Sequence, residues 1–293
     1  MKIETLTNLI GGELINRPYI SEVVNFTDNV DEVKRGSCFF ARDLTDIPRA
    51  IKNGAYAIIT DRYVEVLDKE IAWIKVDNFE NAAFNIFKYE NLKHQIYIVD
   101  KISLMIIDAI SLDKRVIVLR GVKDFFKVIN LKEKFIFTDD KKFVRIFANV
   151  KSLKEKDVDL KPLGLFKSVY EGSEINLPFV YKNQFGKVIS FFNENSLKYT
   201  LDFKLSRFRP VFVDALLREV EFGQSERVVI TGIENDEFFF DELNFFIENT
   251  KHAKAVVIDE KRVNLLKKPF NFAMAVGFEF VANKIEEKGL FND

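Results

Sequence analysis

The chain has 293 residues, a mass of 34.1 kDa, a formal net charge of −1 and a pI near 6.3. A chain of this length is large enough for two domains and can bury a sizeable core. Its charge balance lacks the basic surface that nucleic acid or an anionic membrane requires, and its single cysteine excludes an internal disulfide framework. The amino terminus has no uninterrupted apolar signal core, and no run of about 18 apolar residues occurs. We therefore expect a cytoplasmic protein that neither spans a membrane nor binds nucleic acid.

The first sixty residues alternate between short helices and apolar strands. A short amphipathic helix is expected to end at Gly11–Gly12, where glycine can adopt the left-handed conformation that stops a helix. Ser37–Ala41 and Ala55–Thr60 are apolar runs typical of buried strands, and Cys38 is expected in the core. A helix between them is indicated by Pro48 in its first turn and a glycine just past its end.

The expected elements continue along the chain to residue 138. They are a strand at Ala72–Val76, a helix with an apolar face (Phe79, Ala82, Ala83, Ile86, Phe87), a strand at Gln95–Val99, a helix at Ile102–Ile110, and strands at Arg115–Leu119 and Phe135–Thr138. Residues 143–148 form either a helix or a strand. Residues 151–161, rich in Lys and Asp, are expected to form a linker or an excursion.

The rest of the chain predicts mixed strands followed by a return to α/β structure. Lys187–Phe192 and Leu197–Phe203 alternate in polarity, which indicates antiparallel strands. The later expected elements are a helix at Val211–Phe222 with Pro210 at its start, a strand at Arg227–Gly232, a helix at Asn235–Asn249, a strand at Ala253–Asp259 and a closing helix at Phe278–Lys288. The turn Thr231–Asn235 ends a strand and opens a helix, which is an anion-binding geometry, but its single glycine is a weak signal.

Three consecutive segments together resemble the N-terminal, UDP-sugar-binding domain of the Mur ligases: Leu6–Ile15 with its Gly-Gly pair, Val33–Ala41 and Ala50–Ile59. Mur ligases are ATP-driven enzymes that build the peptidoglycan stem peptide. The resemblance covers the first third of the chain well and the rest only faintly. The alternative for these segments is an unrelated α/β domain with βαβ units.

The resemblance implies an α/β fold with three parts. These are a Mur-ligase-like N-terminal α/β domain at residues 1–95, a reduced central region with mixed strands at 96–209, and a C-terminal Rossmann-like α/β domain at 210–293. Because functional Mur ligases carry three domains and are considerably longer, the central region is expected to have lost most of its ATP-binding part.

Ligation in this family requires a glycine-rich turn whose backbone N–H groups cradle the ATP phosphates, with a Lys and a Ser or Thr beside them. The turn directly follows the first strand of the central domain, which corresponds here to Gln95–Val99. No glycine occurs between Gly54 and Gly121, and the only Gly-Lys pair, at Gly186, has Tyr181 where the loop's first glycine belongs. We therefore expect no ATP site and no cofactor.

Two vestigial sites follow from the resemblance. Lys101 and Ser103 are a candidate remnant of the phosphate site. The family's nucleotide-contacting Asp-Ser-Arg or Asp-Thr-Arg triplet falls on Asn29-Val30-Asp31, seven residues before Gly36, and a shift of one residue brings Asp28 into register. Neither alignment supplies an arginine, whose loss is not conservative. The candidate vestigial precursor-binding rim comprises Asn29, Asp31, Arg42, Asp46 and Arg49, with Arg42 or Arg49 as the compensating cation.

Metal binding by Cys and His is excluded by their number, and the two histidines are isolated. The phenylalanines between 238 and 246 cannot all lie on one face of a helix. Phe239 and Phe246 are expected in the core, whereas Phe238, Phe240 and Phe245 are the candidate partner surface.

The sequence thus predicts a non-catalytic Mur-ligase-like protein that acts as an accessory or scaffold in peptidoglycan precursor synthesis. Its expected partners are proteins of cell-wall synthesis or a second copy of the chain, with weak binding of a UDP-MurNAc-type ligand as a further expectation. The alternatives are an active UDP-MurNAc-peptide ligase with an unrecognised nucleotide site and an unrelated α/β binding protein. An enzyme would be an ATP-dependent amino-acid or peptide ligase.

Overall fold

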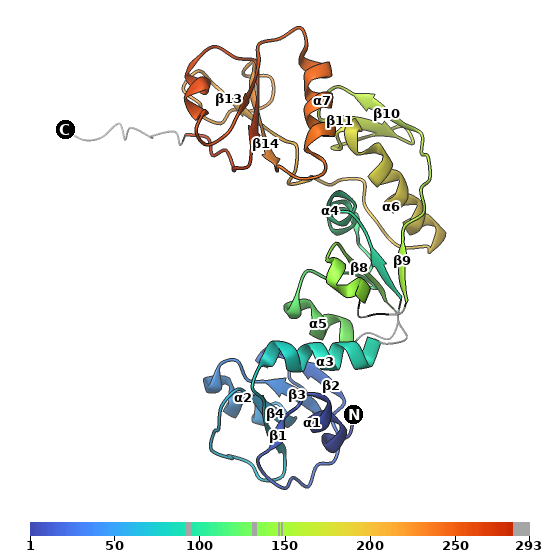
Figure 1. Ribbon diagram of the computed structural model, residues 1–293, viewed down its shortest axis with the longest axis vertical. Helices are drawn as coiled ribbons and strands as arrows, with labels where there is room; N and C mark the ends of the chain where they lie inside the picture. The colour runs from blue at the N-terminus through green and yellow to red at the C-terminus, as the bar shows by residue number, and fades with distance from the viewer. Residues whose placement is uncertain (92–94, 131–133, 146, 148, 284–293) are drawn as a thin grey trace, which may run out of the picture. The chain divides into compact units, whose positions relative to one another are not determined.

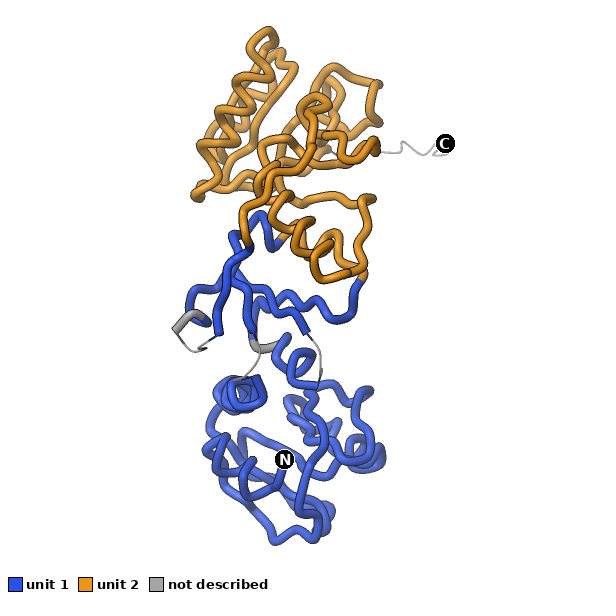
Figure 2. The backbone as a smooth tube through the Cα atoms, turned by 90° about the vertical axis from the view of Figure 1, so that its right-hand side faces the viewer, with its two compact units in different colours: residues 1–104, 113–153 blue, residues 105–112, 154–293 orange. Residues whose placement is uncertain are grey.

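The computed structural model describes residues 1–91, 95–130, 134–145, 147 and 149–283 (Figure 1). Within these residues the protein is α/β, as predicted, with parallel and mixed sheets and helices between the strands. The chain divides into two compact units, residues 1–104 with 113–153 and residues 105–112 with 154–293 (Figure 2). The division expected at residues 95 and 209 stays a prediction.

The N-terminal sheet of unit 1 has the strand order β1-β5-β4-β3-β2. Its strands are β1 (Glu13–Leu14), β2 (Asn25–Thr27), β3 (Ser37–Phe40), β4 (Ala55–Thr60) and β5 (Ala72–Lys75), and its helices are α1 (Ile3–Leu9), α2 (Ile47–Lys52) and α3 (Phe79–Asn91). Strands β2 to β5 run parallel, and β1 pairs antiparallel with β5. The expected strands at 37–41 and 55–60 are confirmed as neighbours in this sheet.

Both faces of β3 are buried, which is why its sequence is continuously apolar rather than alternating. Cys38 and Phe40 belong to one core cluster, whereas Phe39 and Ala41 belong to the cluster on the opposite face. Burial raises the pKa of the Cys38 thiol, which keeps it protonated and unreactive. The cysteine is therefore a core residue, as expected.

The glycine before β3 is required by both backbone conformation and packing. Gly36 has φ +92°, a value that side chains other than glycine rarely adopt. A Cβ at this position would lie 2.9 Å from Cγ2 of Val24. The Gly36 carbonyl accepts a hydrogen bond from the Val24 N–H at 2.8 Å, which holds the backbone around Gly36 close to the backbone around Val24.

The second part of unit 1 is a parallel sheet with the strand order β7-β8-β6-β9. Its elements are β6 (Ile96–Ile98), β7 (Val116–Val118), α5 (Val122–Ile129), β8 (Phe135–Thr138), the 3-10 helix η3 (Lys141–Arg145) and β9 (Val150–Ser152). Helix α4 (Lys101–Ile110) follows β6; its residues 101–104 belong to unit 1 and its residues 105–110 to unit 2. Phe126 of α5 packs on Phe40 with ring centroids 4.8 Å apart, and Phe125 stacks on Phe87 at 4.5 Å. Aromatic packing therefore joins this part to the N-terminal sheet in one core. Of the ambiguous segment 143–148, residues 146 and 148 lie outside the described residues.

Unit 2 contains two further sheets. An antiparallel sheet is formed by β10 (Leu160–Leu163), β11 (Lys167–Tyr170) and β12 (Ser173–Ile175), and is followed by the 3-10 helix η4 (Phe179–Tyr181) and α6 (Lys182–Glu194). The other sheet has the order β13-β14-β16-β15, with β13 (Arg209–Val213), β14 (Arg227–Ile233), α7 (Phe239–Thr250), β15 (Ala255–Ile258), the 3-10 helix η5 (Val263–Lys267) and β16 (Phe272–Val276).

The prediction of antiparallel strands at 187–192 and 197–203 is wrong. Residues 187–192 lie inside α6, whose buried side chains recur at helical spacing: Phe185, Val188, Ile189 and Phe192. Within 197–203 the structure shows a single bridge, between Tyr199 and Ser111. The alternation was too short to separate a strand from the apolar face of a helix.

The prediction of a helix at 211–222 is also wrong, because Arg209–Val213 forms strand β13 at the edge of its sheet. An edge strand tolerates Pro210, whose missing N–H removes no inner ladder bond. In the expected closing helix, residues 278–283 are not helical, and 284–288 lie outside the described residues. The expected helix at 235–249 begins only at Phe239.

We expect Gly36→Ala to lower the free energy of unfolding of unit 1 by about 1–3 kcal/mol, because it combines an unfavourable φ with a steric clash. The change can be measured by urea denaturation followed through the fluorescence of Trp73, the single tryptophan, which is buried in unit 1. Gly11→Ala is the matched control, since Gly11 also has a positive φ but has no atom within 4 Å of the added Cβ. Equal effects of the two substitutions would contradict the packing argument.

Candidate functional site

The connection from β6 to α4 follows the strand after which the sequence resemblance implies a phosphate-binding turn. Strand β6 lies inside its parallel sheet, between β8 and β9, and ends at Ile98. Helix α4 begins at Lys101, so only Val99 and Asp100 join the two elements. A phosphate-binding turn needs a longer glycine-containing loop whose successive N–H groups curve around the anion. Two residues without glycine do not form such a loop.

The first turn of α4 is already capped by an anion that the chain itself provides. Asp100 accepts hydrogen bonds from the Ser103 backbone N–H at 2.7 Å and from Ser103 Oγ at 2.8 Å. Ser103 is buried, and its hydroxyl is directed to this carboxylate. At this helix start, the Ser103 N–H and the positive end of the helix dipole therefore stabilise the Asp100 carboxylate. Lys101 occupies the first helical position next to it.

The single Gly-Lys pair of the chain lies in a different environment from this connection. Gly186 and Lys187 are inside α6, which runs from Lys182 to Glu194, rather than in a turn between a strand and a helix. Lys187 forms an ion pair with Glu155 at 3.3 Å. Neither residue presents a curved set of backbone donors.

The structure places the predicted rim residues at the carboxyl ends of β2 and β3. The Asn29 side chain accepts a hydrogen bond from the Asp31 N–H and so caps the short 3-10 helix η1 (Val30–Glu32). Asp31 pairs with Arg49, and Asp46 precedes the first residue of α2. The segment after β2 therefore meets the amino-terminal part of α2.

The second rim arginine is also paired. Arg42, just after β3, donates from Nε to Asp28 at 3.1 Å, and its guanidinium lies 5.8 Å from the centre of the Phe79 ring. Both rim arginines thus have aspartate partners: Asp31 belongs to the rim, and Asp28 lies next to it in the sequence. Because both guanidinium groups are exposed, a ligand carboxylate or phosphate would compete with a chain carboxylate for each of them.

The phenylalanines of the predicted partner surface lie on or next to α7. Phe240 is 70% exposed, whereas Phe246 is buried. Phe238 and Phe245 are half-buried, the first near the Arg207 guanidinium and the second packed edge-on against Phe208. The helix therefore buries one aromatic side chain and presents another to solvent.

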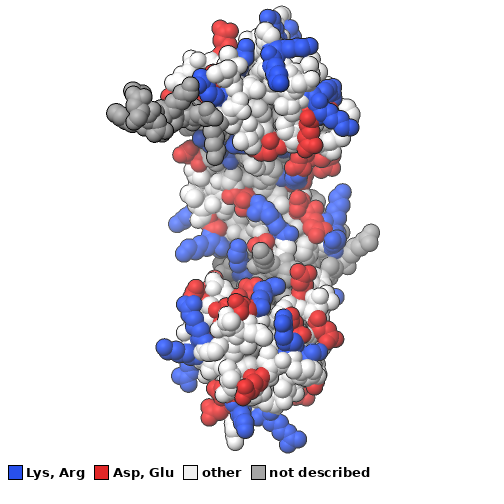
Figure 3. Space-filling model, turned by 90° about the vertical axis from the view of Figure 1, so that its left-hand side faces the viewer, with Lys and Arg blue, Asp and Glu red and all other residues white. Residues whose placement is uncertain are grey.

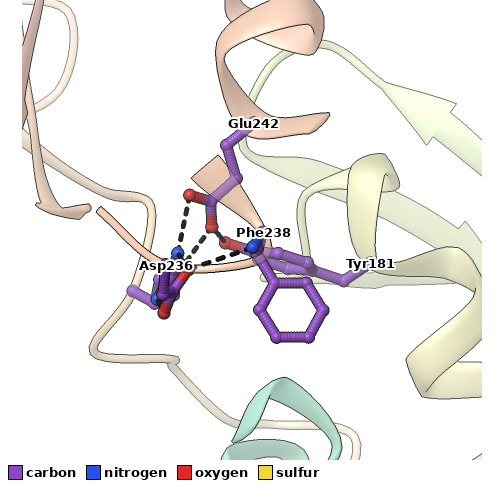
Figure 4. A network of polar contacts seen from close by, with 5 residues as sticks. Tyr181, Asp236, Phe238 and Glu242 are labelled. Carbon is purple, nitrogen blue, oxygen red and sulfur yellow. Dashed lines mark hydrogen bonds and ion pairs between the residues drawn. The ribbon is translucent and has the colours of Figure 1, made fainter. Parts of the chain in front are cut away.

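A buried polar network in unit 2 was not predicted from the sequence. Arg207 exposes 2% of its surface and Glu242 none. Arg207 donates to both oxygens of Glu242, at 2.5 and 2.9 Å, and to both oxygens of Asp236, at 2.6 and 2.7 Å. The Tyr181 hydroxyl donates to Glu242 as well, and the Phe238 N–H donates to Asp236 (Figure 4). These contacts join η4, the segment before β13 and the start of α7.

The buried side chains of the network, Arg207, Glu242 and Tyr181, each form hydrogen bonds within it. Burial, with Glu242 as the second cause, raises the pKa of Tyr181 well above its ordinary value, so this hydroxyl stays a donor. Burial alone would lower the pKa of Arg207, but its hydrogen bonds to Glu242 and Asp236 outweigh that effect and raise it. Tyr181 and Arg207 therefore both stay protonated near neutral pH, and their hydrogen bonds tie the three segments together.

The sequence contained a weak signal for this network. Glu242 lies on the same helical stripe as Phe239 and Phe246, at spacings of three and four residues. A carboxylate on an otherwise apolar face must be paired when that face is buried. The sequence did not identify Arg207 as the partner, because the two residues are far apart along the chain.

Charges of both signs are interspersed over the surface shown in Figure 3, and neither sign forms a continuous patch there. Among the described residues, no group of three or more His, Cys, Asp or Glu side chains could hold a metal ion. No helix within the described ranges is long and apolar enough to cross a membrane.

The sequence matches no protein-family model and no curated protein. Among solved structures, the chain is similar to MurF from Acinetobacter baumannii, with 10% identity and a TM-score of 0.48 over 94% of this chain and 86% of that chain. It is also similar to the MurF ligase from Thermotoga maritima in complex with ADP, with 11% identity and a TM-score of 0.40 over 86% of this chain and 93% of that chain. At these identities, the similarity assigns no residue a role.

We expect Arg207→Met to destabilise unit 2 by about 3–5 kcal/mol, because it leaves a buried carboxylate without a counter-charge. The matched control is Arg209→Met, which removes an exposed ion pair with Glu279 and should cost less than about 1 kcal/mol. Urea denaturation followed by circular dichroism measures the change, while the Trp73 fluorescence transition reports on unit 1. A cost below 1 kcal/mol for Arg207→Met would contradict the structural role of the network.

Proposed function

We propose that the protein is a non-catalytic relative of the Mur ligases that acts as an accessory or scaffold in peptidoglycan precursor synthesis. The proposal combines the resemblance of residues 6–59 to the family's N-terminal domain with the two-residue connection between β6 and α4. The connection is the observation that carries the proposal, because it concerns the position at which the family binds ATP. A scaffold would keep the fold while losing this site.

Two properties of this connection act against ATP binding. First, it offers no run of backbone N–H groups for the phosphates. Second, the Asp100 carboxylate occupies the helix start, where it would repel a polyphosphate. Displacing the aspartate would also remove a helix cap, at a cost of about 0.5–2 kcal/mol. Both effects act against nucleotide binding and, with it, against formation of an acyl phosphate.

Binding of a precursor at the rim is also expected to be weak, because chain carboxylates already pair with the rim arginines. The rim offers Arg42 and Arg49 to an anionic ligand, but their partners Asp28 and Asp31 would be left unpaired when the ligand binds. The electrostatic attraction between the ligand and these arginines is therefore offset by the loss of their attraction to the two aspartates. A UDP-MurNAc-type ligand bound at this rim would depend on contacts other than these two guanidinium groups.

Partner binding is proposed to use the aromatic side chains on and next to α7: the exposed Phe240 and the half-buried Phe238 and Phe245. A large exposed aromatic side chain that can be buried on association is typical of interaction sites. Phe240 is the best test because its exposure makes it dispensable for the fold.

We expect Mg-ATP to bind no more tightly than about 1 mM, because the cradle of backbone donors is missing. Isothermal titration calorimetry on the full chain measures this affinity. Asp100→Asn is the informative variant, since it can retain the cap but removes the charge, and it should leave ATP binding undetectable. Micromolar binding to the wild type would favour the active-ligase alternative instead, and binding gained only by the variant would show that charge alone excluded the nucleotide.

We expect Phe240→Ser to leave the unfolding transition nearly unchanged but to weaken capture of cell-wall precursor enzymes, or self-association, by tenfold or more. Affinity purification from the native organism, together with analytical ultracentrifugation of the purified chain, measures the two outcomes. Phe222→Ser is the matched control, because Phe222 is 84% exposed but lies outside α7. Equal capture by wild type and Phe240→Ser would remove this surface from the proposal, and capture of no precursor enzyme by wild type would remove the scaffold function.

A further inference from the structure

The segment between β9 and β10 crosses helix α6 at a glycine. A Cβ on Gly186 would lie 2.5 Å from the carbonyl oxygen of Lys156 and 3.4 Å from Cγ2 of Val158. Glycine inside a helix costs about 1 kcal/mol relative to alanine. Its presence here allows the backbone of the segment to contact the backbone of the helix. We refer to residues 154–158 as the strap.

Three ion pairs of alternating sign hold the strap against α6. Glu155 pairs with Lys187 at 3.3 Å, Lys156 with Glu194 at 2.5 Å, and Asp157 with Lys182 at 2.8 Å. Consecutive strap residues therefore carry negative, positive and negative charge, and each meets its opposite on the helix. A shift of the strap by one residue would place like charges together, so the pattern fixes its register.

Most of the strap is exposed and lacks regular backbone structure. Residues 154–157 are all exposed, and the structure assigns them to no helix or strand. Hydrogen bonds from Lys182 and Lys156 lower the pKa values of Asp157 and Glu194, so both carboxylates stay charged at neutral pH. Exposed pairs contribute little individually and are screened by salt. The strap is thus an element of low local stability.

We propose that the strap is a salt-sensitive latch, closed on α6 by the three ion pairs over Gly186 and released when ionic strength rises. The strap begins where the chain enters unit 2, since Leu153 is the last residue of unit 1 in this segment. Release frees residues 153–159, the whole connection from β9 to β10, as an extended tether. Ionic strength thereby sets the fraction of molecules in which the connection from β9 to β10 is free of α6.

Limited proteolysis of the full chain with thermolysin tests the latch. Thermolysin cleaves before bulky apolar residues, so the bond before Val158 is a target that charge substitutions leave intact. Mass spectrometry gives its cleavage rate relative to a synthetic peptide of residues 150–163 in the same buffer, which removes the effect of salt on the protease. Cleavage follows the population of the open strap when opening and closing are fast.

We expect the relative rate to rise about fivefold or more between 0.05 and 1 M NaCl, because loss of each pair is worth about a two- to fivefold change. Lys187→Gln should raise the rate at low salt, whereas Lys167→Gln, which removes an exposed pair with Glu174 elsewhere in unit 2, should not. Glu155→Lys should also raise the rate, and Glu155→Lys combined with Lys187→Glu should restore it.

Gly186→Ala should raise the rate about tenfold even at low salt, because its Cβ displaces the Lys156 carbonyl. The unfolding transition of each variant is measured in parallel, and the charge variants keep the test valid if Gly186→Ala fails to fold. A relative rate that is independent of salt overturns the proposal, whether or not Gly186→Ala changes it. Failure of the charge-swapped double variant to restore protection overturns the assigned register.

Discussion

The buried contact between Arg207 and Glu242 is the interaction on which the arrangement of unit 2 depends. It joins residues that lie 35 positions apart in the chain, and through Tyr181 and Asp236 it also includes η4 and the turn before α7. A buried ion pair is often no more stabilising than well-packed apolar side chains, but breaking one side of it is costly. Its effect is therefore to specify one arrangement of these segments rather than to increase stability greatly.

A glycine allows this arrangement to form. Gly232 in β14 has φ +78°, and a Cβ there would lie 2.2 Å from the carbonyl oxygen of Ser206 and 3.0 Å from Cα of Arg207. The segment that carries Arg207 can pass β14 at this distance only because Gly232 has no side chain. Gly186 serves the same purpose, since the Lys156 carbonyl oxygen lies 2.5 Å from the position of its missing Cβ. At Gly36 in unit 1 the close neighbour is instead a side-chain carbon, Cγ2 of Val24 at 2.9 Å.

Aspartate at a helix start is the second recurring feature. Asp100 accepts hydrogen bonds from the first turn of α4, and Asp236 accepts from the Phe238 N–H just before α7. Both positions follow parallel strands, where a helix start commonly binds a ligand anion. In this chain the carboxylates satisfy those backbone donors internally. At both helix starts these hydrogen bonds contribute to the stability of the fold.

The sequence by itself determined the local elements of the first unit. The buried strands at 37–41 and 55–60, the helix between them and the turn at Gly36 follow from unbroken apolar runs and from glycine and proline positions, whose physical causes are local. The sequence also predicts the absence of a glycine-rich turn after residue 99, because such a turn needs particular residues at adjacent positions. Local steric preferences and patterns suffice for such features.

Only the tertiary structure decided the features that depend on distant partners. The strand at 209–213 was mistaken for a helix, because its edge position, which tolerates Pro210, is a property of the sheet. The pairing of Arg207 with Glu242 and of Lys187 with Glu155 joins residues whose sequence separation carries no information about contact. Charged side chains are compatible with solvent or with a partner. Which of the two they meet is decided by the packing of the whole chain, which no local pattern encodes.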